Sequence, residues 1–320
     1  MVVRRRKDRH RWRGTHVPFT GATISASPIP IGGDLVAVNA LTGAVSTVRA
    51  DDGNPRWQYV LEHAVPDDWE YGLEPIEHVV DEASETVAVE GRLFAAPYLV
   101  GLDLETGSLE WTVDGRESDL RSTEPGDGLL ARDGTVYAVT ETEDRDLHVR
   151  SIDAATGERG WERTLSRSGS GHAGFAADER ALYHVGSLDR SGTDPIAVTA
   201  LALEDGHVRW TETFDDGPIT ESGPESATGS IASIHRQPPT VAGDAVLVPS
   251  DRGLHALEKT SGDHLWTFTE LVGTSGGSEV PREATTPPVV VGDRVVIGTT
   301  LAVYGLDLEG ERGGTEEGGE

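Results

Sequence analysis

Short apolar runs, each preceded by turn-forming residues, recur along most of the chain. Six runs are rich in β-branched or aromatic residues, and they occupy residues 35–38, 93–94, 136–139, 182–185, 246–248 and 295–297. The turn formers ahead of them are Gly32-Gly33-Asp34, Glu90-Gly91, Asp133-Gly134, Asp178-Glu179, Gly243-Asp244 and Gly292-Asp293. Such a pattern predicts strands joined by tight hairpins. No stretch has a helical period of useful length, so we expect an all-β fold.

The tryptophans mark a second and more regular feature. Five of the seven follow a glycine by four residues. The pairs are Gly53 and Trp57, Gly107 and Trp111, Gly157 and Trp161, Gly206 and Trp210, and Gly262 and Trp266. A fixed spacing of this kind is the signature of an internal repeat.

The repeat extends upstream of each glycine. Six residues before the glycine stands a small residue, in chain order Thr47, Gly101, Ser151, Ala200 and Ala256. Directly before the glycine is Asp, Thr or Ser, which can hydrogen-bond the backbone of its own turn. The glycine supplies the positive φ that a short hairpin needs. The motif therefore predicts a strand, a tight turn and an outgoing strand that carries the tryptophan between neighbouring units.

Each motif and the hairpin before it make a unit of four strands. Apolar residues upstream supply the innermost strand, as at 239–242 and 288–291. Four-stranded units that repeat about every 50 residues describe the blades of a β-propeller. We count six units and expect six blades. Seven or eight blades are the alternatives, with a degenerate blade within residues 58–90 or 211–240.

The motif resembles the PQQ-like (pyrrolo-quinoline quinone) repeat family, whose signature Ala-x-Asp-x-x-Thr-Gly-x-x-x-Trp is also called the tryptophan-docking motif. The clearest copies run from Gly101 to Trp111 and from Ser151 to Trp161. The resemblance covers residues 28–310 and implies a β-propeller of four-stranded blades. The motif differs from WD40 repeats, which would show Trp-Asp pairs, because this sequence has none.

The sixth unit lacks its tryptophan, and the N-terminal segment offers a replacement. Residues 303–308 pass into a Gly- and Glu-rich stretch, whereas Trp12 lies ahead of the first unit. We therefore expect the segment around Trp12 to supply the outer strand of the last blade and close the ring. The expected organisation is a basic tail at 1–10, the propeller at 11–310 and an acidic, disordered tail at 311–320.

The charge of the chain indicates an unusual solvent. The formal net charge is −28, and Lys7 and Lys259 are the only lysines. So much like charge destabilises a compact state in dilute buffer, whereas in 1 M salt electrostatic interactions are screened over about 3 Å. We therefore expect a halophilic source. We also expect no nucleic-acid partner, because DNA binding needs Lys and Arg to displace counterions and the one basic stretch is residues 4–13.

Composition also limits the chemistry and the compartment. There is no cysteine, so disulfides, thiol catalysis and Cys-ligated zinc are excluded. No run of about 18 apolar residues exists, and we expect no transmembrane segment. The basic start is not followed by an apolar stretch, so the chain as written carries no export signal and a cytoplasmic location is the default. A mis-assigned start codon would leave an exported or cell-surface protein as the alternative.

Two motifs resemble catalytic ones but lack the necessary context. Residues Gly169 to Gly174 fit G-x-G-x-x-G, yet a dinucleotide site needs a strand before the motif and a helix after it. Here a polar loop precedes the motif and another strand follows it. Ser170 and His172 share this Gly/Ser loop, where nothing fixes the geometry of a catalytic triad. We expect a flexible loop and no catalytic residues.

The candidate metal ligands are scattered along the chain. Five of the eleven histidines are His63, His78, His184, His235 and His264, and none forms a His-x-x-x-His or a Glu-flanked zinc pair. Asp51-Asp52-Gly53-Asn54 and Asp67-Asp68 hint at calcium. The ligand spacing of an EF-hand is missing, and Asp52 and Gly53 are already turn residues. No defined metal site is expected.

The family resemblance raises the question of the quinone cofactor itself. Catalytic quinoproteins hold it with a stacked tryptophan, a calcium ion and, commonly, a disulfide between adjacent cysteines. This chain has no cysteine, is much shorter, and uses its tryptophans in the repeat. We therefore expect no cofactor, and a PQQ-dependent quinoprotein oxidoreductase is the alternative.

The favoured function is a non-catalytic, monomeric module that binds or scaffolds other proteins, because propellers present loops on a rigid frame. The longest segments outside the motifs are residues 61–80, 213–237 and 270–287. Trp69 and Tyr71 in the first segment would anchor a protein partner, since aromatic residues dominate binding hot spots. The alternative is that Trp69 packs beneath its own loop. The resemblance points to envelope-associated assembly propellers and to stand-alone members of unknown role.

Overall fold

The computed structural model describes most of the repeat region. The described residues are 28–39, 42–65, 74–93, 96–115, 120–122, 128–142, 146–165, 172–187, 196–214, 238–250, 253–269, 272–275, 278–281, 286–292, 294–298 and 303–307. They divide into two compact units, the first ending at Ser166 and the second beginning at Arg167. The expected tails at 1–10 and 311–320, and Trp12 with the ring closure assigned to it, lie outside the described residues.

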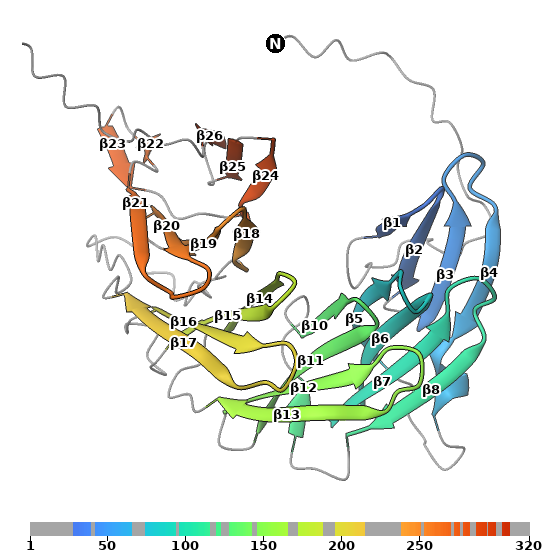
Figure 1. Cartoon of the computed structure of the whole chain (residues 1–320). Coiled ribbons are helices and arrows are strands. Elements are labelled where there is room, and N and C mark those ends of the chain that lie inside the picture. The colour runs from blue at the N-terminus through green and yellow to red at the C-terminus, as the bar shows by residue number, and fades with distance from the viewer. Residues whose placement is uncertain are drawn as a thin grey trace, which may run out of the picture. The chain divides into compact units, whose positions relative to one another are not determined.

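The first unit holds three antiparallel sheets (Figure 1). The first sheet contains β1 (Ile29–Ile31), β2 (Asp34–Asn39), β3 (Ala44–Arg49) and β4 (Pro55–Val60). The second contains β5 (Glu74–Asp81), β6 (Thr86–Leu93), β7 (Ala96–Asp103) and β8 (Leu109–Asp114). The third contains β10 (Leu129–Arg132), β11 (Thr135–Thr142), β12 (Leu147–Asp153) and β13 (Arg159–Leu165), with β9 (Leu120–Ser122) paired to β11.

The second unit continues the same pattern. The fourth sheet contains β14 (His172–Ala177), β15 (Ala181–Ser187), β16 (Ile196–Ala202) and β17 (Val208–Phe214). The fifth contains β18 (Thr240–Ala242), β19 (Ala245–Ser250), β20 (Gly253–Glu258) and β21 (His264–Phe268). A two-stranded hairpin, β22 (Val272–Ser275) and β23 (Ser278–Pro281), precedes the last sheet of β24 (Val289–Val291), β25 (Arg294–Gly298) and β26 (Val303–Asp307).

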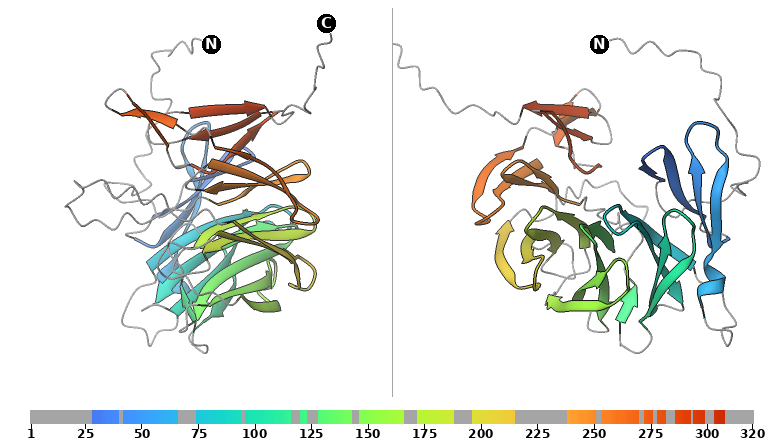
Figure 2. Two further views of the ribbon diagram at one scale, coloured as in Figure 1. Left: turned by 90° about the vertical axis from the view of Figure 1, so that its left-hand side faces the viewer. Right: turned by 45° about the vertical axis from the view of Figure 1, so that its right-hand side comes forward.

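Within each of these larger sheets, every main strand pairs antiparallel with the next one along the chain. Figure 2 shows the ribbon from two further sides. Meanders of this kind are the blades of β-propellers. The all-β prediction is confirmed, and the six larger sheets among the described residues agree with the six units of the sequence. Within the same residues there is one 3-10 turn, η1 (Leu61–Ala64), and no helix with the length and apolarity to cross a membrane.

One predicted turn is wrong. Glu90-Gly91 lies inside strand β6, and the hairpin that joins β5 to β6 turns at residues 82–85. The turn is built without glycine: Asp81 Oδ1 accepts hydrogen bonds from the backbone N–H and the hydroxyl of Ser84, and Glu85 takes a φ of +53°. An Asp that bonds the backbone ahead of it stabilises such a turn, and here, as at Asp178 in the fourth unit, it replaces the glycine that marks the remaining units.

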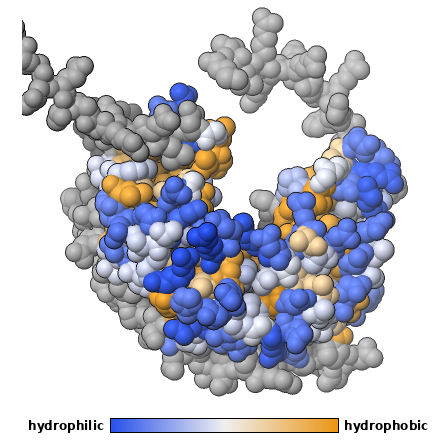
Figure 3. All heavy atoms as spheres, in the orientation of Figure 1, coloured by the Kyte–Doolittle hydropathy of each residue, from blue (hydrophilic) through white to orange (hydrophobic). Residues whose placement is uncertain are grey.

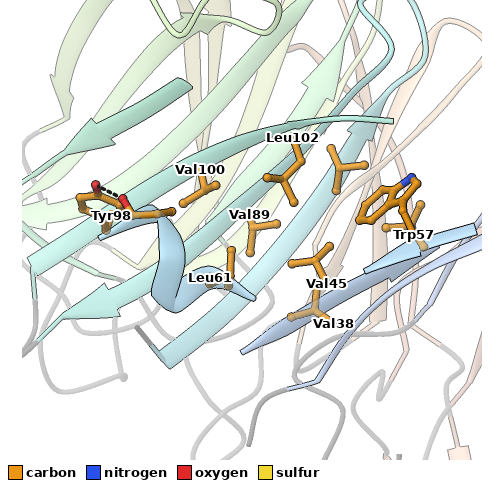
Figure 4. Close-up of a cluster of buried hydrophobic side chains, with 11 residues drawn as sticks. Val38, Val45, Trp57, Leu61, Val89, Tyr98, Val100 and Leu102 are labelled. Carbon is orange, nitrogen blue, oxygen red and sulfur yellow. Dashed lines mark hydrogen bonds between the residues drawn. The ribbon is translucent and has the colours of Figure 1, made fainter. Parts of the chain in front are cut away.

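Five of the six apolar runs lie in middle strands that are buried on both faces. The run at 93–94 is the exception, because Leu93 is the last residue of β6, Phe94 lies outside the described residues, and Val87 and Val89 are the buried valines of that strand. Between the first and second sheets, valines of β2, β3, β6 and β7 pack with Trp57, Leu61 and Leu102 (Figure 4). The Tyr98 hydroxyl donates a 2.9 Å hydrogen bond to the carbonyl oxygen of Ala64 in the same cluster. Burial of both faces explains why these strands read as continuous apolar runs rather than as alternating ones. On the surface shown in Figure 3, hydrophilic residues cover most of the described part, with apolar patches between them.

Candidate functional site

Tryptophan side chains join a sheet to the next one along the chain in both units. The indole N–H donates to a backbone carbonyl oxygen of the following sheet, and the pairs are Trp57 with Leu104 (2.8 Å), Trp111 with Ala154 (2.8 Å) and Trp210 with Lys259 (3.1 Å). Each acceptor stands three residues before the motif glycine of its own sheet. These three rings are 6–9% exposed. The conserved spacing within the repeat therefore builds a seam, which we define as the contact between two consecutive sheets.

Two small residues make room for each indole. The motif glycine of the following sheet has a positive φ and lies against the ring, as Gly157 does against Trp111, where a β-carbon would be 2.7 Å from Cγ. The small residue upstream lies directly opposite the tryptophan on the neighbouring strand, as Gly101 does opposite Trp111. A β-carbon at Gly101 would overlap the ring. Steric room for the indole thus explains both small positions of the motif.

The seam between the fourth and fifth sheets contains a buried polar group in addition. The Tyr183 hydroxyl lies 2.9 Å from Asp178 Oδ2 and 3.2 Å from the carbonyl oxygen of Lys259, and the Lys259 ammonium is 3.7 Å from Asp178. Burial by itself would raise the pKa of the Asp178 carboxyl. Hydrogen bonds from the N–H groups of Arg180 and Ala181 and from the Tyr183 hydroxyl, together with the charge of Lys259, outweigh burial, so the pKa lies below its usual value. Lys259, one of the two lysines of the sequence, therefore helps to stabilise this seam.

A cavity of about 530 Å³ opens at the seam between the first and second sheets. The first sheet contributes the turn at Gly32 and Gly33, Asp34, and side chains of β3 and β4. The second sheet contributes the β5–β6 turn and the β7–β8 turn. All of these elements belong to the first unit. The volume lies within the range of about 300–1,000 Å³ that is typical of ligand pockets. We call this space the seam cavity.

Carboxylates dominate the charge of the seam cavity. Arg56 Nε lies 2.6 Å from Asp34 Oδ2, so these two opposite charges compensate each other. Three further lining carboxylates belong to Glu82, Glu85 and Glu105. Among the described residues, none of these three is in a side-chain hydrogen bond or an ion pair. The cavity is therefore lined by three exposed carboxylates that have no ion-pair partner among the described residues.

Thr47 lines the same cavity and is the small residue of the first repeat. It lies directly opposite Trp57, is 1% exposed, and its hydroxyl oxygen has no hydrogen-bond partner among the described residues. The corresponding hydroxyl in the third sheet is satisfied, because Ser151 Oγ accepts a 2.9 Å hydrogen bond from the backbone N–H of Trp161. A buried hydroxyl without a partner costs about 1–3 kcal/mol, so Thr47 is an unusual choice where the other copies have Gly, Ala or a hydrogen-bonded Ser.

A chain of hydroxyls and imidazoles lies between the fourth and fifth sheets. His255 Nε2 is 3.2 Å from Ser250 Oγ, and its Nδ1 is 2.9 Å from Thr267 Oγ1. The same Thr267 oxygen is 2.7 Å from His264 Nε2, and Phe214 stacks on His255 at 4.3 Å between ring centroids. The hydroxyls of Thr267 and Ser250 lie beside the two ring nitrogens of His255, and both Ser250 and His255 are buried. As described, the arrangement therefore lacks the access to substrate that a catalytic triad needs.

A half-buried and a fully buried charged side chain also lie between the second and third sheets. Glu77 Oε2 accepts hydrogen bonds from the N–H groups of Gly128 and Leu129, at 2.8 and 2.9 Å. Arg150 is 2% exposed, and burial lowers its pKa while the carboxylates of Glu162 and Glu90 oppose that change. We infer that these residues help to hold the second and third sheets together.

The residues singled out in the sequence are dispersed. His63 lies within η1, His78 and His184 are buried in β5 and β15, and His264 is exposed on β21. Asp52 accepts a hydrogen bond from the N–H of Asn54, as a turn residue should. Within the described ranges, no three His, Asp or Glu side chains gather as metal ligands. The members outside the described residues are Asp67, Asp68, Trp69, Tyr71, Gly169, Ser170 and His235.

The structure describes only the last three residues of the G-x-G-x-x-G motif at Gly169 to Gly174. Its last three residues, His172 to Gly174, lie in strand β14, so a strand and not a helix follows the motif. Sequence reasoning missed the seam cavity and the His255 cluster. A weak signal for the cavity existed in Thr47, the one threonine at the small position of the repeat.

The sequence matches a family model described as outer membrane protein assembly factor BamB, in overlapping stretches at residues 2–147, 66–213 and 145–313. No protein of curated function matches it. Among solved structures, the fold is similar to BamB from Moraxella catarrhalis, with 18% identity, a TM-score of 0.59, and 91% of this chain and 75% of that chain covered.

Two further solved structures share the fold. A quinohemoprotein alcohol dehydrogenase from Comamonas testosteroni has 14% identity and a TM-score of 0.54, with 86% of this chain and 56% of that chain covered. The Dos1 propeller has 13% identity and a TM-score of 0.55, with 90% and 68% covered. At these identities the likeness concerns the fold alone, which is that of a β-propeller.

Proposed function

This chain belongs to the PQQ-like repeat family described as outer membrane protein assembly factor BamB, and on that basis we propose that it is a non-catalytic module that binds or scaffolds partner proteins. Solved structures with this fold include BamB and a quinohemoprotein alcohol dehydrogenase. Which of the two functions this chain has depends on its own residues.

The use of the tryptophans is the observation that carries this proposal. The rings of Trp57, Trp111 and Trp210 are buried between sheets, and their N–H groups are bonded to the next sheet. An indole in that position has no free face on which a quinone ring can stack. The described residues also contain no group of three acidic or imidazole side chains that would hold calcium beside a quinone. The burial of these three rings therefore supports the binding function over quinone chemistry.

A rigid set of seams supports the proposed role directly. Sheets locked to one another hold their connecting turns in fixed positions, and turns on a rigid frame are where binding residues concentrate. We propose that the loops at 61–80, 213–237 and 270–287 and the turns of the sheets present this binding surface. Trp69 and Tyr71 are the proposed aromatic anchors of the first loop.

Affinity capture followed by reconstitution tests the proposal. The full chain is used as bait in a high-salt extract of its source organism, and each captured protein is then purified and titrated against the chain. A reproducible partner with a saturable affinity is expected. An unrelated protein of similar net charge serves as the control bait. Failure to obtain any saturable partner contradicts the proposed function.

A parallel measurement addresses the oxidoreductase alternative. The chain is mixed with PQQ and calcium, and the bound chromophore and dye-linked oxidation of alcohols or sugars are measured. Neither is expected. One chromophore per chain together with turnover would replace the binding function by the enzymatic one.

We also propose that the protein works in concentrated salt. The net charge of −28 over 320 residues is the basis for this, because mutual repulsion of carboxylates favours expansion unless ions screen it. The seam cavity adds a local example, with three exposed carboxylates that have no ion-pair partner among the described residues.

A further inference from the structure

Resting on the proposed binding function, we propose that the seam cavity takes the guanidinium group of an arginine side chain from the partner protein. The cavity lies between the first and second sheets, within one compact unit. Its charge, its apolar wall, its unsatisfied hydroxyl and the dispersion of its carboxylates each favour this ligand.

Charge selects a cation. Glu82, Glu85 and Glu105 line the cavity, and the one cation among the lining residues, Arg56, is already paired with Asp34 at 2.6 Å. Three like charges around one space repel one another, and a bound cation relieves that repulsion. The Arg56–Asp34 pair shows that a guanidinium already occupies one edge of the cavity in contact with a carboxylate.

The wall of the cavity fits the stem of a long basic side chain. Ile31 and Leu104 line it, and both are partly buried against the apolar cluster between the two sheets. Gly32 and Gly33 leave open space at the rim, since a β-carbon at either position would meet nothing within 4 Å. Arg and Lys bury their methylene stems along apolar surface and keep the charged head among polar groups.

Thr47 is the second and independent observation. Its side chain is 1% exposed, it lines the cavity, and its hydroxyl has no described hydrogen-bond partner. Apolar residues fill the same position in the fourth and fifth sheets, where Ala200 and Ala256 stand opposite their tryptophans. The oxygen is itself covered by neighbouring atoms, so a ligand N–H bonds it once the Thr47 side chain rotates toward the cavity, and then supplies the partner that the protein itself does not.

The dispersion of the carboxylates favours guanidinium over a metal ion. Ca²⁺ needs 6–8 oxygen ligands converging on one point. No three acidic or imidazole side chains converge in that way among the described residues, although several acids line this cavity. A guanidinium instead directs five N–H donors outward in a plane, so it can reach acceptors that lie apart from one another. Lysine has a compact charge and fits separated acceptors less well.

A matched pair of peptides tests the inference on the full-length chain. The probe is acetyl-Gly-Arg-Gly-amide, and the control replaces arginine by citrulline, which has nearly the same shape without the charge. Binding is followed by NMR through the backbone amide signals of Gly32, Gly33 and Glu85, at one fixed salt concentration. The arginine peptide is expected to shift these signals with saturation and to bind about tenfold or more tightly than the citrulline peptide.

Two variants locate the binding. The triple substitution Glu82→Gln, Glu85→Gln and Glu105→Gln is expected to weaken the arginine peptide about tenfold or more. The control makes the same change of charge at exposed positions elsewhere, with Glu62→Gln, Glu158→Gln and Glu204→Gln, and is expected to change the affinity less than twofold. Thr47→Val keeps the shape of the side chain, so the melting temperature is expected to hold or rise while peptide affinity falls severalfold.

The outcomes separate this inference from the proposed function. Equal loss of affinity in both triple variants would reveal non-specific attraction to an acidic surface and would overturn the cavity as the site. Equal binding of the two peptides would overturn guanidinium recognition. If the captured partner binds the cavity triple variant as tightly as the parent chain, the cavity is not the partner site and the binding function stands. If the parent chain binds no partner, the binding function itself fails.

Discussion

Gly157 packs so closely on the indole ring of Trp111 that a β-carbon at position 157 would lie 2.7 Å from Trp111 Cγ. The two residues belong to consecutive sheets, and the indole N–H of Trp111 also bonds the carbonyl oxygen of Ala154, three residues before the glycine. One short turn therefore supplies both the acceptor and the flat surface that receive the ring.

The glycine gives a first prediction with a matched control. Gly157 and Gly134 both lie in the third sheet with positive φ, +72° and +82°, but a β-carbon at Gly134 would meet nothing within 4 Å. Alanine at either position carries the cost of a left-handed backbone, about 1–2 kcal/mol. Gly157→Ala is expected to lose about 1–3 kcal/mol more than Gly134→Ala, because it also displaces the indole. Denaturant unfolding measures the difference, and equal losses would contradict the seam contact.

The indole hydrogen bond gives a second prediction. Trp111→Phe removes the donor to Ala154 and part of a ring that is 6% exposed. The expected loss in unfolding free energy is about 1–3 kcal/mol, since a lost hydrogen bond costs about 1 kcal/mol and the smaller ring leaves space. Leu109→Ala on the same strand, where the side chain is 39% exposed, is expected to cost about 0.5 kcal/mol or less. A Trp111→Phe loss no larger than that of Leu109→Ala would speak against the seam.

Burial of His78 gives a dependence of stability on pH. The side chain is 3% exposed, and burial lowers its pKa below the ordinary value near 6.5. Below that value the unfolded chain binds a proton that the folded chain resists, so the contribution is present above about pH 6.5 and falls with acidification, by up to about 1.4 kcal/mol per pH unit. Relative to His78→Leu, the parent chain is expected to lose stability from pH 7 to pH 5. Parallel pH profiles of the two proteins would exclude this effect.

The ring closure that the sequence indicates gives a fourth prediction. If the segment around Trp12 forms the outer strand of the last blade, removal of residues 1–20 deprives that sheet of a partner and lowers the melting temperature. Removal of residues 311–320, the expected disordered tail, serves as the control and is expected to leave the melting temperature unchanged. A melting temperature unaffected by the first deletion refutes the closure.

The acidic composition gives a fifth prediction. The unfolding midpoint is expected to rise as potassium chloride increases from dilute buffer to about 1 M, because the screening length falls to about 3 Å. A neutral propeller of similar size provides the reference for effects of salt on water rather than on charge. Complete folding of the chain in dilute buffer without added salt would show that it needs no such screening.

The repeat could be read from the sequence because its parts lie close together in the chain. Trp57, Trp111 and Trp210 were placed correctly on outgoing strands, since each follows its own glycine by four residues. The reason for the small residue upstream could not be read, because Gly101 meets Trp111 across two strands and only the pairing register brings them together. The turn at 82–85 was missed because Glu85 takes a positive φ that glycine usually takes.

The seam cavity could not be predicted in the same way. Asp34, Glu82 and Glu105 come from three different turns, and no spacing in the chain relates them. They share one space only because two sheets stack at a distance that Trp57 and Gly107 set. In a chain so rich in acids, three more carboxylates also carry no signal of their own.

The second sheet carries both a ring to insert and a turn to receive one, because its Gly107 lies against Trp57 and its own Trp111 lies against Gly157 of the third sheet. A tandem duplication of such a repeat would therefore produce a copy that already has the residues needed to contact the sheet before it and the sheet after it. The number of repeats in such a protein can therefore change without any new type of contact between sheets. Individual turns, such as those around the seam cavity, can then change in one copy without affecting the others.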